Sequence, residues 1–394
     1  MNGEPSVLRR LWNISRREVG IFFHRPMYLF CMLTAPLLTL LFFTTLMYEG
    51  LPTELPAGIV DEDNTNISRT IVRTLDSFEE TDLKYSYPNF TEARKAMQRG
   101  EIYAFFHIPS GTTSDALASR QPKVAFYTNE SYLVPGTLLM KDLRYASELS
   151  GLALTRETLF AKGATERQAM GVIQPLVIET HPLGNPHLNY SVALSNIVIP
   201  GVLMLMIFLT TAYTIGIEWK HESQHTWLKM AGDSPALALA GKLFPQTLLF
   251  CLMFVLMDIC LYHFMGFPCK CGLMPMILLG ILSVLASQAF TVFLFGIFSG
   301  QMRVAMCLCS LWGILSFSLA GFTYPVTGMS QGLQMMASLF PLRHYYLIYV
   351  NQALNGYSIT YAWSSVSALL CFMLLPLLVL HRYRKAFDSL KYKP

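Results

Sequence analysis

The chain has 394 residues, of which 53% are hydrophobic and only 14% are charged. Soluble domains carry about 25% charged residues, so this composition excludes an ordinary soluble protein. Residues 49–190 hold 13 Lys/Arg and 18 Asp/Glu, whereas the remainder holds 16 and 7. The basic part is thus the hydrophobic part, and no soluble basic stripe of the kind that binds nucleic acid is present.

Residues 1–26 are expected to form a cytoplasmic amphipathic helix. Between Val7 and Phe23 apolar residues recur at helical intervals, and the arginines occupy the other side. This pattern is typical of a helix that lies in the membrane interface. The segment carries five arginines, namely Arg9, Arg10, Arg16, Arg17 and Arg25.

Six apolar runs are long enough to cross a bilayer core about 30 Å thick. The first is transmembrane helix 1, residues 27–48, and five more lie within residues 191–380. Those five are residues 192–217, 243–264, 273–298, 304–322 and 361–380. The tail, residues 381–394, is as basic as the N-terminal segment, so the positive-inside rule places both termini in the cytoplasm and residues 49–190 outside it.

Residues 304–342 contain no charged residue, and as one helix they would be about 58 Å long, twice the bilayer core. Two spans here would put the termini on opposite sides of the membrane, against the charge pattern. Gly328, Gly332 and Pro341 also divide the stretch. We therefore expect one span followed by a short re-entrant or interfacial segment on the outer side, residues 323–356.

Residues 49–190 are predicted to form an α/β domain. Strands are expected at residues 57–61, 102–108, 124–127 and 177–180, and helices at 68–78, 90–100 and 132–162, from their apolar periodicity and turn residues. No catalytic motif or metal-ligand spacing is found there, and all eight cysteines lie elsewhere. The predicted fold is therefore an all-α membrane protein of six transmembrane helices with an N-terminal interfacial helix. An α/β extracytoplasmic domain is inserted between spans 1 and 2.

Asp258 is the one charged residue inside the predicted spans. Intramembrane acids are functional candidates by default, so Asp258 is a candidate polar site for substrate or protons. It also lies near the outer end of its span, where the alternative is contact with water.

Three stretches resemble one family, the bacterial ABC type-2 exporter permeases with a large outer domain after the first span. They are "GIVDEDNTNISRTIVRTL" with "EARKAMQRGEIYAFFHIPSG", the loop "IGIEWKHESQHTWLKMAGDSPALALAGK", and "GFTYPVTGMSQGLQMMASLFPLRHYYLIYVNQALNG". They occur in the family's order and fit the predicted topology.

The resemblance implies that the inner loop, residues 217–242, contains a coupling helix that seats in a partner ATPase. The matching residues are Glu218, Glu222, Thr226, Ser234-Pro235 and Gly241-Lys242. Glu218, Glu222 and Thr226 recur every four residues, which predicts one helix face; an ordinary solvated helix is the alternative. His225 stands where the family often has Gly.

The resemblance also implies an outer gate in residues 323–356. Its candidate residues are Tyr324, Pro325, Pro341, Arg343 and His344. Interfacial anchoring is the alternative role for the last two.

The partners follow from the same resemblance. "GKL" at residues 241–243 lacks the glycine-rich turn and the hydroxyl of a phosphate-binding loop, so ATP and Mg²⁺ are expected on a separate ABC ATPase, and no cofactor or metal on this chain. A second permease, self or sister, completes the pathway, and a periplasmic adaptor is a further candidate partner.

The expected function is export of a hydrophobic or amphipathic compound across a bacterial inner membrane. The alternative is a non-transporting receptor or assembly protein whose outer domain binds a partner. A membrane enzyme is disfavoured, since no nucleophile or metal cluster is evident.

Overall fold

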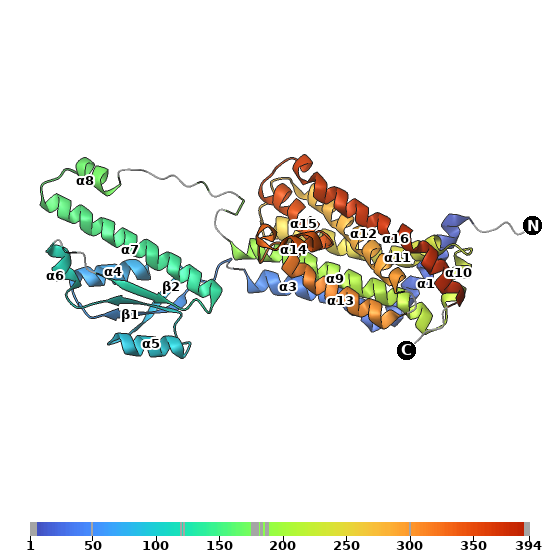
Figure 1. Ribbon diagram of the computed structural model, residues 1–394, viewed down its shortest axis with the longest axis horizontal. Coiled ribbons are helices and arrows are strands. Elements are labelled where there is room, and N and C mark those ends of the chain that lie inside the picture. Colours follow the sequence, from blue (N-terminus) through green and yellow to red (C-terminus); the bar gives the residue numbers. More distant parts are fainter. Residues whose placement is uncertain are drawn as a thin grey trace, which may run out of the picture. The chain divides into compact units, whose positions relative to one another are not determined.

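The structure is a computed structural model that describes residues 6–48, 50–118, 120, 123–174, 181, 184–185, 189–298 and 301–389. The chain forms two compact units (Figure 1). One comprises residues 1–48 and 182–394, and the other residues 49–181.

Among its described residues, the larger unit contains six helices long and apolar enough to cross a membrane, as predicted. The first combines α2 (Pro26–Leu29), the π-helical η1 (Phe30–Thr34) and α3 (Ala35–Leu46). The others are α9 (Tyr190–Lys220), α11 (Pro235–Asp258) continuing into η2 (Ile259–Phe264), α12 (Leu273–Ile297), α13 (Met302–Leu319), and η5 (Ile359–Ala362) with α16 (Trp363–Ser389).

Glycines allow the spans to approach closely. A Cβ on Gly296 of α12 would lie 2.7 Å from Val379 of α16, and one on Gly201 of α9 would lie 2.3 Å from Phe317 of α13. Small residues at helix interfaces are typical of membrane bundles, where packing rather than hydrophobicity drives association.

The uncharged stretch after residue 304 is divided into short elements, as predicted, although not at each predicted residue. Pro341 begins a helix, whereas Gly328 is the last residue of a 3-10 turn and Gly332 lies inside a helix. Helix α13 ends at Leu319, and Gly321 follows with φ +95°. Then come η3 (Val326–Gly328), α14 (Gln331–Ala337), α15 (Pro341–Tyr349) and the π-helical η4 (Val350–Leu354). Trp312 of α13 stacks on Phe340 with ring centroids 4.8 Å apart, which folds these elements back onto the span.

The predicted N-terminal helix forms as α1 (Val7–His24). Its apolar side is divided between two surroundings. Ile14 and Phe22 are buried in the core of the larger unit, whereas Leu8, Trp12 and Phe23 are exposed. Its position in a membrane interface stays a prediction.

The smaller unit is an α/β sandwich with strand order β2-β1-β3-β4. Strands β1 (Leu55–Asp61), β2 (Thr81–Ser86) and β3 (Ala104–Ile108) are parallel, and β4 (Ala125–Thr128) is antiparallel to β3. Helices α4 (Asn66–Asp76) and α7 (Leu133–Ala161) cover one face and α5 (Phe90–Gln98) the other. Two further helices are α6 (Thr112–Leu117) and α8 (Glu166–Ile173).

Strand β2 was not predicted from its amino-acid pattern. Its residues, Thr-Asp-Leu-Lys-Tyr-Ser, are polar because an edge strand is largely solvated. The predicted strand at residues 177–180 lies outside the described residues.

Candidate functional site

The loop between the second and third spans forms a short helix, α10 (Gln224–Met230), at the same end of the larger unit as α1 (Figure 1). Helix α9 ends at Lys220, and residues 221–223 form a turn. After α10, Gly232 and Asp233 adopt φ +65° and +60°. Ser234 then begins α11 as its N-cap, accepting a hydrogen bond from the Leu237 N–H, with Pro235 in the first turn.

The expectation that Glu218, Glu222 and Thr226 share one helix face is wrong. Glu218 lies on α9, Thr226 on α10, and Glu222 in the turn between them with φ +53°. A left-handed residue cannot continue a right-handed helix, so the four-residue spacing has no geometric meaning here. Glu222 and Thr226 are exposed, but Glu218 is only 1% exposed.

Glu218 instead belongs to a buried charge network, which we define as Arg17, Glu18, Glu218 and Lys242. The Lys242 Nζ lies 2.7 Å from Glu218 Oε1 and 2.8 Å from Glu18 Oε2. The Arg17 guanidinium donates to the Glu218 carboxylate at 3.0 Å, and the Ser223 hydroxyl also donates to it. The network therefore joins α1, α9 and α11.

The charges of this network balance within a buried site. Lys242 and Glu18 are fully buried. Burial raises the pKa of the Glu18 carboxyl, and the charge of Lys242 opposes that rise. Taking such ions out of water is costly unless each is paired and hydrogen-bonded, so the arrangement holds its three helices in one geometry.

Trp227 connects α10 to this network. Its ring lies 5.2 Å from the Lys242 Nζ, and its Nε1 donates to the Ala238 carbonyl at 3.1 Å. The same ring packs edge-on against Trp219 of α9 and Phe387 of α16, with centroids 6.2 and 5.1 Å apart. One buried side chain thus attaches α10 to three spans.

Helix α1 is attached to α11 beside the network. The Ser15 hydroxyl donates to the Gly241 carbonyl at 2.9 Å, and a Cβ on Gly241 would lie 3.0 Å from the Ile14 Cβ. Sequence reasoning did not single out Glu18. The available signal was an acidic residue next to an arginine within an otherwise basic amphipathic segment.

The five predicted outer-gate residues have separate surroundings. Tyr324 and Pro325 are exposed, and the Tyr324 hydroxyl donates to the Gly328 carbonyl at 3.3 Å. Pro341 begins α15. Arg343 donates to the Ala320 carbonyl at 3.4 Å, and the His344 Nε2 lies 2.8 Å from the Ser338 carbonyl oxygen. The last two tie α15 to the preceding loops.

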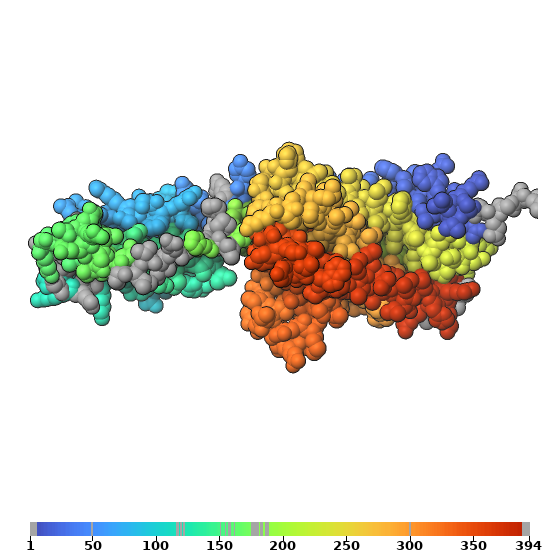
Figure 2. All heavy atoms as spheres, turned by 90° about the horizontal axis from the view of Figure 1, so that it is seen from above, coloured from blue at the N-terminus to red at the C-terminus, as the bar shows by residue number. Residues whose placement is uncertain are grey.

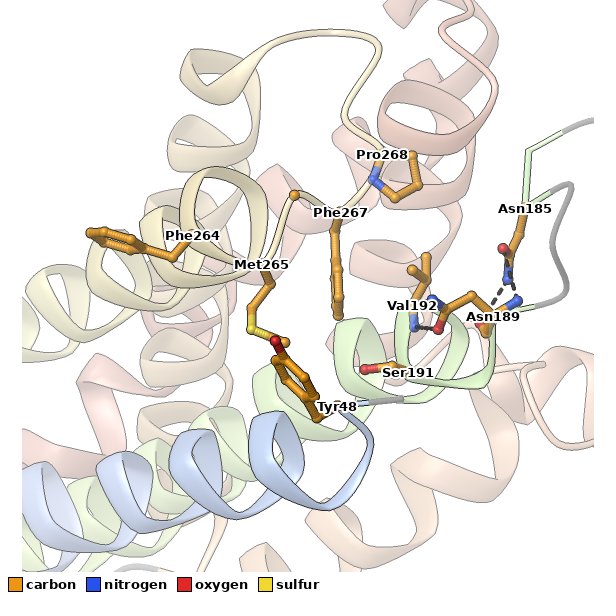
Figure 3. A pocket seen from close by; sticks show the side chains of 10 residues that line it. Tyr48, Asn185, Asn189, Ser191, Val192, Phe264, Met265, Phe267 and Pro268 are labelled. Atoms are coloured by element: carbon orange, nitrogen blue, oxygen red, sulfur yellow. Dashed lines mark hydrogen bonds between the residues drawn. The ribbon is translucent and has the colours of Figure 1, made fainter. Parts of the chain in front are cut away.

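A pocket of about 590 Å³ opens at the end of the larger unit opposite α1 (Figure 3). Tyr48, Ser191, Met265 and Phe267 lie around it, at the end of α3, the start of α9 and the loop after η2. The Asn189 side chain accepts from the Val192 N–H at 3.2 Å and so fixes the start of α9. None of the predicted gate residues lines this pocket.

Asp258 is 1% exposed at the end of α11, and no group of the described residues donates to either carboxylate oxygen. The alternative in which Asp258 reaches water is not what the structure shows.

A model of the ABC-2 family of transporter proteins matches residues 26–380, which include the first five spans, most of the sixth and the α/β unit. A search of curated proteins returned no match.

Proposed function

Because this chain belongs to the ABC-2 transporter family, we propose that it is the permease subunit of an exporter that moves an amphipathic compound out of the cytoplasm. Permeases of this family are the transmembrane component and are not themselves ATPases, so membership implies an ABC ATPase partner. ATP and Mg²⁺ would be bound by that partner.

The observation that carries the proposal is the two-sided character of α10. Glu222, His225 and Thr226 are exposed on or beside it, whereas Trp227 and Leu228 are buried against the spans. A short helix with one exposed polar side and one side packed against several spans can bind a soluble partner and transmit that partner's movement to the spans. Ser234 and Pro235, which begin α11, would hold the C-terminal end of α10 in place.

The buried charge network supplies the route by which such a push reaches the spans. A displacement of α10 moves Trp227, which touches Lys242, and Lys242 holds both Glu218 on α9 and Glu18 on α1. Packed interfaces of this kind switch between discrete arrangements rather than deform continuously. Glu218 is therefore assigned to transmission inside the permease and not to ATPase contact.

The charge distribution supports the orientation. The end of the larger unit that carries α1, α10 and the last turns of α16 contains the arginines of α1 together with Lys220, Lys229, Arg382 and Arg384. By the positive-inside rule this end faces the cytoplasm, which puts residues 49–181 outside a bacterial inner membrane. A second permease, self or sister, would complete the pathway, and an adaptor is a candidate partner of the outer unit.

Two remaining candidates keep roles in the proposed pathway. Residues 323–356, with Tyr324 and Pro325 at their exposed surface, would form the outer closure, which Arg343 and His344 brace from behind. Asp258 would provide a polar point inside the spans, because an unpartnered buried carboxylate favours binding a proton or a cationic group.

Co-purification from the native membrane tests the ATPase partner. We expect a soluble chain with a phosphate-binding loop to be captured with the full-length protein, and the double variant Glu222→Ala/Thr226→Ala to lose most of it. The matched control, Thr70→Ala/Glu166→Ala, changes two exposed residues of the smaller unit and should retain it. Capture of an outer partner with no ATPase would favour the receptor alternative, and equal ATPase recovery in both variants would refute the docking role of α10.

A further inference from the structure

A groove of about 290 Å³ runs between α11, α12 and α16 in the half of the spans nearest α1. Its walls are almost wholly apolar and include Ala240, Leu243, Val292, Pro376 and Leu380. Figure 2 shows the face of the larger unit on which α16 lies along α12. Neither the buried charge network nor the proposed ATPase-facing surface of α10 includes these walls.

The groove opens toward lipid. Leu377, one of its lining residues, is 63% exposed, and Leu374 on the same helix is 60% exposed. Large apolar side chains exposed on a span face hydrocarbon and not water, so a water-soluble ligand has no route to this site.

The two ends of the groove differ in chemistry. At the far end, Gln288 of α12 is hydrogen-bonded to the Thr247 hydroxyl of α11 at 2.6 Å. Gly296 packs against Val379, which sets the register of α12 against α16. The lining residues of α12 run from Leu285 to Val292 and therefore cover about 10 Å along the helix axis. The groove thus lies within one leaflet, since half of the hydrocarbon core is about 15 Å.

The near end is basic. Arg384 follows Leu380 by one helical turn on the same side of α16, and it is exposed. Side chains on a helix lean toward its N-terminus, which on α16 is the direction from Arg384 toward the groove. Arg382 lies beside it and donates to the Ile297 carbonyl at the end of α12 at 3.3 Å.

We propose that this groove binds one acyl chain of an anionic phospholipid, with its phosphate at Arg384. The apolar walls fit part of the chain, the groove lies within one leaflet, and the basic end fits an anionic headgroup, as basic pockets between membrane helices do. On α11, Leu243 of the groove wall comes directly after Lys242 of the buried charge network. The bound lipid therefore supports α11 beside the contact through which coupling is proposed to pass. That this leaflet is the cytoplasmic one rests on the proposed orientation.

Lipid retention by the full-length protein tests the proposal. The purified chain is exchanged into mild detergent with equimolar phosphatidylglycerol and phosphatidylethanolamine, and bound lipids are counted by native mass spectrometry. Ala240→Trp fills the groove. Its matched control is Leu248→Trp, two turns along α11 on an exposed position outside the groove. Arg384→Gln removes the headgroup contact, with Lys229→Gln as the control for charge alone.

We expect one phosphatidylglycerol to stay with the wild type, Leu248→Trp and Lys229→Gln, and to be lost from Ala240→Trp. Arg384→Gln should still bind lipid, with its preference for phosphatidylglycerol reduced about fivefold, the effect of one arginine near an anionic surface. Equal retention by Ala240→Trp and Leu248→Trp would overturn the site. An unchanged preference in Arg384→Gln would overturn the headgroup assignment. Both results are independent of whether an ATPase partner is found.

Discussion

Replacing Lys242 with Met should destabilise the larger unit far more than the loss of one surface ion pair. The Nζ lies 2.7 and 2.8 Å from two carboxylates, and the side chain is fully buried. At an effective dielectric constant near 20 each contact is worth about 6 kcal/mol before desolvation. Breaking a buried pair by removing one partner costs about 3–5 kcal/mol, because the other charge stays buried without its partner.

The same reasoning predicts strong non-additivity. In Lys242→Met, Glu18 and Glu218 repel each other, and only Arg17 remains to balance them. The triple variant Lys242→Met/Glu18→Gln/Glu218→Gln removes three of the four charges and leaves Arg17, whose side chain is 27% exposed and can be solvated. We therefore expect it to recover most of the lost free energy of unfolding. Its transport coupling should still be impaired, since the link between α1, α9 and α11 is gone.

The free energy of unfolding of each variant can be measured in mixed micelles by tryptophan fluorescence, because Trp227 lies 5.2 Å from the Lys242 Nζ. The loss in the single variant should be smaller at low pH, where protonation of Glu18 relieves the repulsion. That carboxyl already has a raised pKa, so its contribution to stability is largest below the unfolded pKa and falls as pH rises through the folded one. A cost below about 1 kcal/mol for the single variant, or equal costs for the single and triple variants, would refute the network as described.

Three further predictions concern other parts of the chain. Burial raises the pKa of Asp142, which accepts a hydrogen bond from Thr81, to about 6, so the smaller unit should lose stability as pH rises through 6. Hydrogen exchange of the full-length protein should show this loss, and Asp142→Asn should abolish it. Gly241→Ala should loosen the packing of α1, because the new Cβ would lie 3.0 Å from Ile14. Gly20→Ala on α1 meets nothing within 4 Å and should stabilise that helix by about 1 kcal/mol. Limited proteolysis of residues 7–24 distinguishes the two variants. Glu222→Gly should raise the free energy of unfolding by up to about 1 kcal/mol, because glycine adopts the left-handed backbone at this position without strain. The same variant should weaken ATPase capture. A gain in both stability and capture would contradict the docking role.

The number of spans and their loops could be predicted from the sequence alone. A helix needs about 20 apolar residues to cross the hydrocarbon core, and stretches of that length without charges can be recognised directly in the sequence. Pro341 likewise acts locally, so a break at this residue in the uncharged segment could be predicted. The predicted break at Gly332 is wrong because Gly332 lies inside α14, and the turn at Gly321 was not predicted.

The buried charge network and the lipid-facing groove were decided only by the tertiary structure. Glu18 lies far in the chain from Glu218 and Lys242, which bound the predicted inner loop, and each alone is typical of a solvated loop or interface. Their meeting depends on the packing of α1 against α11, which Ser15 and Gly241 permit. The turn at Glu222 could not be predicted either, because the spacing of Glu222 from Glu218 and Thr226 is that of a helix. The left-handed backbone of Glu222 is set by the direction in which α10 leaves α9, and this direction buries Trp227.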